Sequence, residues 1–235
     1  MDTGCRGHPC RPARSGLNSD DRTGARFISQ RELFAMGKLI MVRHGESEGN
    51  AIRRFTTSGE AKITDLGRRQ AHEAALRIKL KYKPTLVIAS TFARARETGR
   101  IIAEELGIPI EYEAEFREQS LGDLAGKPYE SIANDPTFDP KRSWVWRAPN
   151  GESHEDVLKR VGPVLDSVAR KHPDDEIVVV SHGGVMRSVW AHVTGSWIDA
   201  HVPPNCGIVV IEHKGGSYGK PEVIGGESSV RESGG

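Results

Sequence analysis

Two stretches of the chain, "LIMVRHG" at residues 39–45 and "IVVVSHGG" at residues 177–184, decide the fold class. Each consists of four apolar residues followed by a polar residue, a histidine and a glycine. A short apolar run bounded by glycine is typical of a strand that is buried on both faces, as strands of parallel sheets are. Packing alone gives no reason for such a strand to end on a cation or an imidazole, so these ends call for a chemical explanation.

Strand-like and helix-like segments alternate along the chain on both sides of these stretches. Apolar strands are expected at 39–42, 86–89, 108–112, 177–180 and 208–211. Helices are expected at 65–82, from Ser90 or Thr91 to Gly107, from 151 to 172 and at 185–194. This alternation predicts the α/β class, as a three-layer α/β/α sandwich whose mostly parallel sheet is covered by helices on both faces.

Several residues mark where these helices should begin, bend and end. Thr64 is the expected N-cap of the first helix, because its side-chain oxygen can accept a hydrogen bond from a free amide of the first turn. Ser90 or Thr91 has the same role for the second helix, and Gly107 is placed to end it. Pro163 is expected to bend the third helix.

The segment from 113 to 150 is irregular and rich in glycine and proline. A long loop-rich insertion inside a compact domain is usually functional. It contains Trp144 and Trp146, which allow two interpretations. Residues 123–152 could form a lid that packs an apolar part of the substrate. Alternatively, the two side chains anchor the loop on the core, since tryptophan is highly buried on average.

The composition excludes several classes of protein. The 235 residues are 37% hydrophobic and 28% charged, with a formal net charge of +1, so no strong field favours nucleic acid or a membrane surface. No apolar run approaches the roughly 18 residues of a membrane helix, and the N-terminal stretch lacks the apolar core of a secretory signal. The three cysteines, Cys5, Cys10 and Cys206, form no disulfide framework and favour a reducing, cytoplasmic location.

We expect one domain at residues 36–214, flanked by two flexible segments. Residues 1–35 are rich in Arg, Gly, Ser and Pro, as in a disordered extension, and 215–235 form a Gly/Ser-rich tail. Met36, just before the first strand, would itself be a natural start of translation. The exposed end of the sheet could pair with a second copy to give a homodimer, although nothing in the sequence demands it.

Polar residues follow three of the expected strands at their carboxyl ends, where ligands bind to open α/β sheets. Arg43 and His44 follow the first strand, Arg94 comes soon after the second, and His182 follows the fourth. Arginine suits bidentate capture of phosphate, and a neutral imidazole is a nucleophile near pH 7. Three glycines would let the backbone approach a ligand closely: Gly45, Gly183 and Gly184.

The order of five motifs resembles that of the histidine phosphatase superfamily, the phosphoglycerate-mutase-like proteins. "VRHGESEGN" at 42–50 is similar to the family's first-histidine motif. The other four follow in the family's order: "STFARARET" at 90–98, "FREQSLGDLAG" at 116–126, "PNGESHEDVLKR" at 149–160 and "VVVSHGGVMRSV" at 178–189. The resemblance extends from about Lys38 to Lys214 and implies the phosphoglycerate mutase-like fold.

The resemblance also implies roles for individual residues. His44 would attack phosphorus and carry a phosphohistidine. Arg43, Arg94 and His182 would hold the phosphoryl oxygens and stabilise the charge of the transition state. Glu118 would protonate the leaving oxygen and then activate water.

Further contacts to substrate are expected from Asn50 and Gly183. No metal and no other cofactor are expected, because two arginines and a histidine supply the positive charge that a metal supplies elsewhere. The expected partner is a small phosphorylated metabolite.

Departures from the mutase pattern favour a phosphatase. Mutases of the family typically show Glu-Arg-His-Tyr-Gly at the acidic motif, whereas this chain has Glu-Gln-Ser-Leu-Gly at 118–122. They also have a paired arginine further on, but Arg142 and Arg147 are not adjacent. We therefore expect a metal-independent phosphomonoester hydrolase. The alternatives are a cofactor-dependent phosphoglycerate mutase and a non-catalytic phosphate-binding module, and the sequence does not identify the phosphomonoester.

Overall fold

The computed structural model describes residues 1, 36–56, 59–214 and 216–224 of the chain. The fold is formed by the described residues from Met36 onward. The predicted extension at residues 1–35 lies almost entirely outside the described residues.

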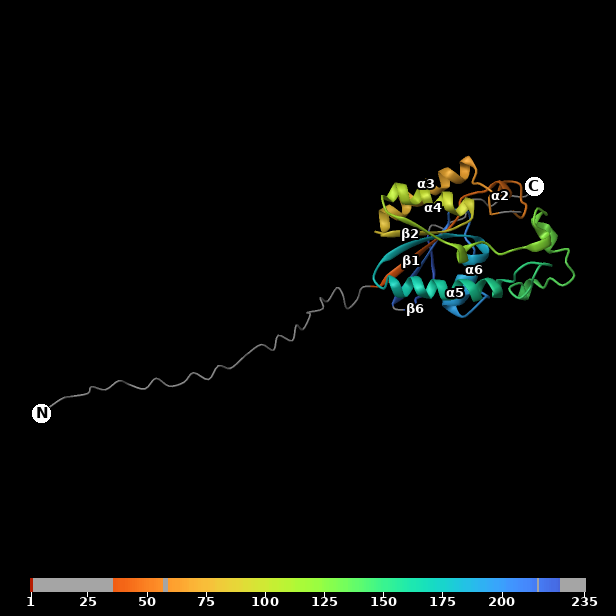
Figure 1. The fold of residues 1–235 in the computed structure, drawn as a ribbon. Helices are drawn as coiled ribbons and strands as arrows, with labels where there is room; N and C mark the ends of the chain where they lie inside the picture. The colour runs from red at the N-terminus through yellow and green to blue at the C-terminus, as the bar shows by residue number, and fades with distance from the viewer. Residues whose placement is uncertain (2–35, 57–58, 215, 225–235) are drawn as a thin grey trace. The chain divides into compact units, whose positions relative to one another are not determined.

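The elements alternate between strands and helices, as expected, and short helices occupy the long irregular segment (Figure 1). The strands are β1 (Gly37–Arg43), β2 (Leu86–Ser90), β3 (Ile110–Glu113), β4 (Glu176–Ser181), β5 (Ile208–Lys214), β6 (Ser217–Tyr218) and β7 (Glu222–Ile224). The α-helices are α2 (Glu48–Ala51), α3 (Asp65–Lys81), α4 (Ala93–Leu106), α5 (His154–Lys171) and α6 (Gly183–Thr194). The 3-10 helices are η1 (Ala114–Phe116), η2 (Gly122–Leu124), η3 (Tyr129–Ile132) and η4 (Pro140–Arg142).

The sheet is mixed and mostly parallel, with the order β3-β2-β4-β1-β5-β6, and β7 pairs with β5. The strands β3, β2, β4 and β1 are parallel to one another, whereas β5 pairs antiparallel with β1. Because β1 and β4 are central and parallel, the two histidine-bearing ends lie next to each other. Arg43 is in register with Ser181.

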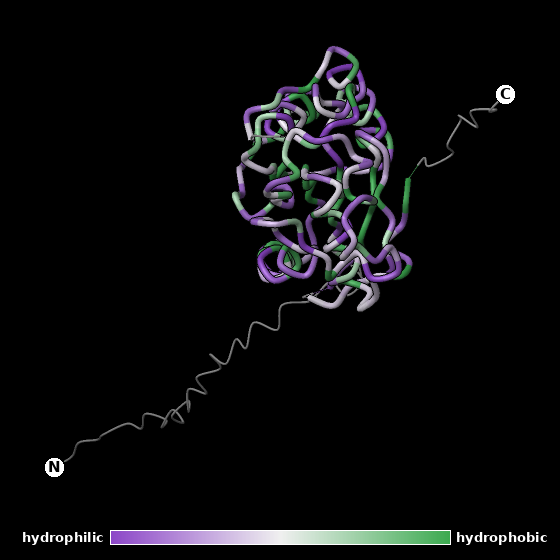
Figure 2. Tube along the Cα trace, turned by 90° about the vertical axis from the view of Figure 1, so that its right-hand side faces the viewer, coloured by the Kyte–Doolittle hydropathy of each residue, from purple (hydrophilic) through white to green (hydrophobic). Residues whose placement is uncertain are grey.

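Helices cover both faces of the sheet, so the predicted three-layer sandwich is confirmed. Alternate residues of β1 face opposite sides, as the pleat of a strand requires. Ile40 and Val42 pack in a cluster with residues of α3 and α4, whereas Leu39 and Met41 pack with residues of α5 and α6. Figure 1 shows these two helix pairs on opposite sides of the sheet, and Figure 2 shows hydrophobic stretches running through the interior.

The predicted ends of α3 and α4 are confirmed in two of three cases. The Thr64 side chain accepts a hydrogen bond from the Gly67 amide, and Gly107 ends α4 in the left-handed conformation with φ of 68°. The prediction of Ser90 or Thr91 as the N-cap of α4 was wrong. Phe92 occupies that position, because the Ser90 hydroxyl is used in contacts with the Phe92 amide and His182.

Two further boundaries differ from the sequence predictions. Helix α5 begins at His154 instead of near 151, because Ser153 caps it in a capping box with Asp156. It continues through Pro163 to Lys171, and the bend expected at Pro163 stays a prediction. The tail was predicted to begin at 215, but β6 and β7 add to the sheet beyond that point by pairing with β5. Periodicity could not show such short strands, because each has only two or three residues.

The irregular segment is anchored by its own small apolar cluster. Trp146 is buried with Leu124 and Ala148, and Phe138 packs edge-on against it. These contacts favour the interpretation that Trp146 anchors the loop. The hypothesis that residues 123–152 move as a lid stays a prediction. In the part of the chain that the structure describes, no helix is long and apolar enough to cross a membrane.

Candidate active site

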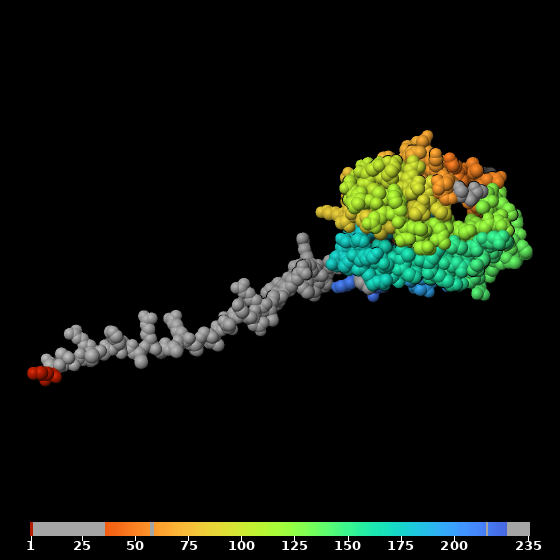
Figure 3. Space-filling model, in the orientation of Figure 1, coloured from red at the N-terminus to blue at the C-terminus, as the bar shows by residue number. Residues whose placement is uncertain are grey.

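The carboxyl ends of β1, β2 and β4, where the sequence places polar residues, meet at one edge of the sheet. They border a cavity of about 510 Å³. Figure 3 shows the surface hollowed between the first part of the domain, in orange and yellow, and the insertion, in green. Five of the seven predicted site residues line this cavity: Arg43, His44, Asn50, Arg94 and Glu118.

His44 is held as a neutral imidazole with a free electron pair on one defined nitrogen. Its Nδ1 lies 2.8 Å from the Gly45 carbonyl oxygen, which can only accept a hydrogen bond, so Nδ1 carries the proton. The other nitrogen, Nε2, therefore accepts from Arg94 Nε at 3.3 Å. Burial, followed by the charge of Arg94, lowers the pKa of His44 well below its usual value. His44 is therefore neutral and suited to nucleophilic attack at neutral pH.

The glycine after His44 serves a different contact from the one predicted. A Cβ on Gly45 would lie 2.4 Å from the carbonyl oxygen of Gly67 in α3, so the close approach is to that helix. The amide of Gly45 donates to Thr98 Oγ1 of α4 at 3.0 Å. The loop that carries His44 is therefore fixed between β1 and the two helices that cover one face of the sheet.

Three buried nitrogens near His44 have no hydrogen-bond partner among the described residues: Arg43 Nε, Arg94 Nη1 and His182 Nδ1. Buried donors without a partner are rare and costly, so their concentration at one edge indicates a site built for a ligand. Two guanidinium groups beside one another also repel, and an anion relieves both costs. Arg94 is 3% exposed, and its burial is the main cause of its lowered pKa.

His182 has no exposed surface and lies behind His44, with ring centroids 5.1 Å apart. Its Nε2 lies 2.8 Å from Ser90 Oγ, which also accepts from the Phe92 amide at 3.3 Å. A hydroxyl can accept two hydrogen bonds, so these contacts alone do not fix the tautomer; where the Ser90 hydroxyl donates to Nε2, the proton of His182 lies on Nδ1, the nitrogen without a partner. Burial, followed by the charge of Arg94, lowers the pKa of His182 well below its usual value, so it offers a neutral donor.

Glu118 lies across the cavity in the irregular segment between η1 and η2. Its Oε1 accepts from the amide of Gln119 at 2.9 Å and from the amide of Gly184, in the first turn of α6, at 3.1 Å. A Cβ on Gly184 would lie 2.6 Å from this oxygen, so a glycine is needed there for the contact. The carboxyl group therefore faces the start of the helix that follows His182.

The predicted contacts of Asn50 and Gly183 with substrate find less support. The Asn50 side chain accepts from Ser47 and Asn205 and donates to the Tyr129 hydroxyl at 2.9 Å, so its polar atoms are occupied within the protein. Gly184 lines the cavity, whereas the structure does not place Gly183 in its lining. Both roles stay predictions.

Sequence reasoning missed other residues of the cavity. Tyr129 and Ile132 of η3 line it, together with His154 at the start of α5. Burial, followed by the charge of Arg187, lowers the pKa of His154 to about 4, and its Nδ1 has no partner among the described residues. The histidine inside the "GESHED" stretch could have indicated this position. Within the described ranges, no group of three or more His, Cys, Asp or Glu side chains could hold a metal ion.

Comparison with known proteins shows the family to which this chain belongs. The model of the histidine phosphatase superfamily (branch 1) matches residues 39–220. This chain belongs to that superfamily. The match covers both strand ends, the insertion and α5, and it extends past residue 214 to include β6.

Relatives within the superfamily carry both mutase-like and phosphatase names. Phosphoglycerate mutase-like protein 4 of Arabidopsis thaliana is 31% identical over 216 residues, covering 89% of this chain and 93% of that protein. The metal-independent phosphoserine phosphatase of the same plant is 29% identical over 163 residues, covering 67% of this chain and 68% of that protein. A mycobacterial glucosyl-3-phosphoglycerate phosphatase, solved as a complex with VO3, superposes with a TM-score of 0.70 at 25% identity, covering 80% and 97%.

Proposed function

We propose that this member of the histidine phosphatase superfamily hydrolyses phosphomonoesters through a phosphohistidine formed on Nε2 of His44. The main observation that supports this proposal is the tautomer of His44. The Gly45 carbonyl holds the proton on Nδ1, so Nε2 keeps its electron pair. That pair lies beside Arg94, at the edge where three buried donors have no partner. A nucleophile and a site for an anion are thus present together.

In the first step, Nε2 of His44 forms a bond to phosphorus while the bond from phosphorus to the ester oxygen breaks. Glu118 gives its proton to that oxygen, so the alcohol leaves neutral. Arg43, Arg94 and the Nδ1 proton of His182 stabilise the oxygens of the transferring phosphoryl group. Because these donors are already fixed and buried, little reorganisation is needed when the charge is redistributed.

In the second step, a water molecule attacks phosphorus and gives a proton to the Glu118 carboxylate. The nitrogen–phosphorus bond breaks, and its electron pair returns to His44. The products are an alcohol and inorganic phosphate, and Glu118 is protonated again for the next cycle. The same carboxyl group therefore serves as acid and then as base, which requires it to lie close to the ester oxygen in both steps.

The charges of the cavity favour hydrolysis over phosphoglycerate mutase activity. A mutase must bind a bisphosphate, which needs cations for a second phosphate group. Of the described residues that line the cavity, Arg43, Arg94 and Arg117 are the cationic ones. Arg117 is already paired with Glu115 at 2.9 Å. Arg147 pairs with Asp156 of α5, away from the cavity.

The substrate we propose is a small phosphorylated metabolite, since relatives are named for phosphoserine and glucosyl-3-phosphoglycerate. A cytoplasmic location accords with the buried free thiol of Cys206. A homodimer through the edge of the sheet has weaker support. The edge strand β3 carries Glu111 and Glu113, and charged residues on an edge strand oppose pairing.

The test is to trap the covalent intermediate. The protein is mixed with a 32P-labelled aryl phosphate, quenched after milliseconds, and the label on the chain is tested for the acid lability and alkali stability of a phosphohistidine. We expect label on the unmodified chain, with and without EDTA, and none on His44→Ala. Label that persists on His44→Ala, or that survives acid, would refute the proposal. His182→Ala is the control, because it weakens phosphate binding but leaves the nucleophile.

A further inference from the structure

Glu118 lies in a segment without regular secondary structure, between η1 and η2. A general acid acts only within hydrogen-bond reach of the leaving oxygen, and a displacement of about 1 Å can cost about 100-fold in rate. Neither strand nor helix hydrogen bonding fixes the backbone at this position, so its place must be set by contacts from other elements.

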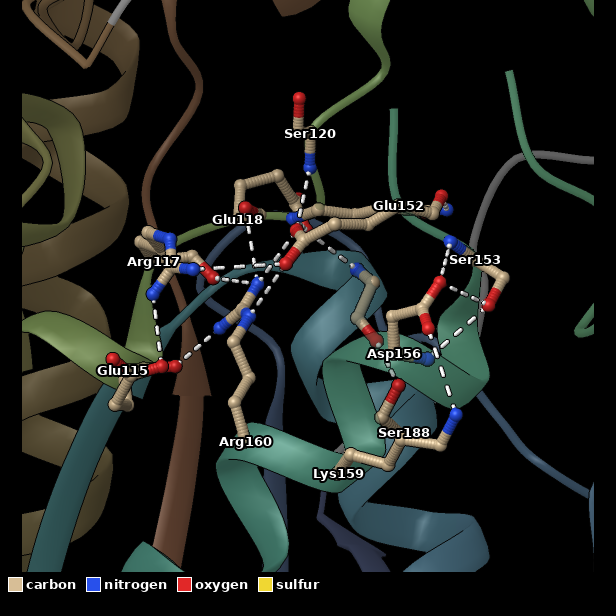
Figure 4. Close-up of polar contacts among 12 residues, drawn as sticks. Glu115, Arg117, Glu118, Ser120, Glu152, Ser153, Asp156, Lys159, Arg160 and Ser188 are labelled. Atoms are coloured by element: carbon tan, nitrogen blue, oxygen red, sulfur yellow. Dashed lines mark hydrogen bonds and ion pairs between the residues drawn. The ribbon is translucent and has the colours of Figure 1, made fainter. Parts of the chain in front are cut away.

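Arg160 of α5 provides contacts to the backbone on the N-terminal side of Glu118. Its side chain is 11% exposed, and its guanidinium donates to three main-chain carbonyl oxygens of this segment. The acceptors are the oxygens of Glu115, of Arg117 at 3.0 Å and of Glu118 itself at 3.3 Å. Figure 4 shows the Arg160 side chain reaching from α5 to this segment. One planar group from a helix therefore fixes the path of the chain into Glu118.

Glu152 provides the matching contacts on the C-terminal side. Its carboxylate pairs with Arg160 through two bonds, Nε to Oε1 at 3.0 Å and Nη2 to Oε2 at 3.1 Å. The same Oε2 accepts from the Ser120 amide at 2.9 Å, and the Glu152 amide donates to the Ser120 carbonyl at 2.7 Å. The Gln119 side chain adds a bond to the Glu152 carbonyl at 2.6 Å. The backbone that leaves Glu118 is therefore fixed as firmly as the backbone that enters it.

The charge of Glu152 is maintained in this half-buried place. Burial acts to raise its pKa, but the hydrogen bonds from Arg160 and the Ser120 amide outweigh it and hold the pKa below its usual value. The Glu152 carboxylate is consequently ionised at neutral pH. Planar, bidentate pairs of this kind add geometric definition as well as energy, and lysine cannot reproduce them.

We propose that Arg160 and Glu152 are positioning residues that set the place of Glu118 for proton transfer. The proposal rests on the function proposed above, in which Glu118 is the acid. Neither residue touches the phosphoryl group; both act through the backbone of residues 115–120. Loss of the pair lets Glu118 move away from the leaving oxygen, while His44 and the donors of the phosphoryl site remain in place.

The experiment measures kcat/KM of Arg160→Lys and Glu152→Gln on 4-nitrophenyl phosphate, a good leaving group, and phenyl phosphate, a poor one. A displaced acid matters more for the poor leaving group, so we expect a loss about ten-fold larger on phenyl phosphate. Arg170→Lys is the matched control, because it is the same substitution at an exposed position of the same helix, and it should change neither rate. Circular dichroism and the affinity for inorganic phosphate should be unchanged in both variants.

The double variant Arg160→Lys with Glu118→Gln separates positioning from a merely structural role. Once the acid is removed, displacing it costs little, so the double variant should match Glu118→Gln within about two-fold. The positioning role would be overturned if the losses of kcat/KM from Arg160→Lys and Glu118→Gln multiplied in the double variant. It would also be overturned if Arg160→Lys and Glu152→Gln each lost kcat/KM equally on both substrates. If Glu118→Gln alone reduces kcat/KM equally on both substrates, Glu118 is not the acid. That result would be a failure of the proposed function. If either single variant does not fold, the other still decides the question.

Discussion

Replacing Arg94 with glutamine should weaken phosphate binding and raise the pKa of His44 together. The Arg94 side chain is 3% exposed, donates to Nε2 of His44 at 3.3 Å, and has a second nitrogen, Nη1, without a partner among the described residues. Its charge is the second cause, after burial, that lowers the pKa of His44. Glutamine keeps a polar side chain of smaller size but removes the charge and the guanidinium.

The expected magnitudes follow from these contacts. A hydrogen bond to a charged group contributes about 1.5–3 kcal/mol, so the affinity for inorganic phosphate should fall about 10- to 100-fold. Loss of one fixed donor to the transition state costs about 100- to 1,000-fold in kcat. A nearby cation disfavours the protonated imidazole, so its removal raises the pKa of His44. Burial still acts on the residue, and its pKa should therefore remain below the usual value.

Two measurements check this prediction. Titration calorimetry gives the affinity for phosphate, and NMR of 15N-labelled histidine follows the protonation of His44 from pH 4 to 8. Arg96→Gln is the control, since it makes the same change at an exposed position two residues further along α4. Unchanged phosphate affinity together with an unchanged His44 titration would refute the view that Arg94 forms part of an anion site around this histidine.

Three further predictions concern other residues and the choice of reaction. The pKa of His154 is about 4 in the fold, against an ordinary value of 6.5. As the pH falls below 6.5, this histidine therefore takes up a proton in the unfolded chain before it does so in the folded chain. The free energy of unfolding, measured by urea titration, should therefore drop between pH 7 and pH 5. In His154→Gln this drop should be smaller by roughly 2 kcal/mol than in the unmodified chain. An equal drop in both proteins would contradict the prediction. Gly184→Ala places a Cβ 2.6 Å from Glu118 Oε1 and should reduce kcat on phenyl phosphate about ten-fold with phosphate affinity retained. A normal kcat would show that this contact is dispensable. Interconversion of 2- and 3-phosphoglycerate in the presence of 2,3-bisphosphoglycerate should be undetectable by NMR, and efficient interconversion would identify a mutase.

Part of the site could be predicted because its residues follow strands at their carboxyl ends. Arg43, His44 and His182 come within two residues of a buried apolar run, so the sheet alone brings them together. The position of Arg94, the second residue of α4, follows from the same logic. Glu118 follows no strand directly, and only the resemblance to a known family indicated it.

Other features could not be read from the sequence because they depend on contacts between distant segments. Gly45 appeared to face a ligand, yet its close neighbour is the backbone of Gly67 in α3. Ser90 appeared to cap a helix, yet its hydroxyl lies against His182, which is 92 residues away. Neither contact has a local pattern, because each partner is chosen by the packing of separate elements.

The sequence by itself determined the order of the longer strands and helices, the burial of "LIMV" and "IVVV", and the set of groups at their ends, because periodicity and residue type are local properties. The tertiary structure decided which nitrogen of His44 keeps its electron pair, which donors lack partners, and how Arg160 and Glu152 fix the backbone around Glu118. Those features depend on distances of about 3 Å between residues far apart in the chain, and only the packed sheet and helices set such distances.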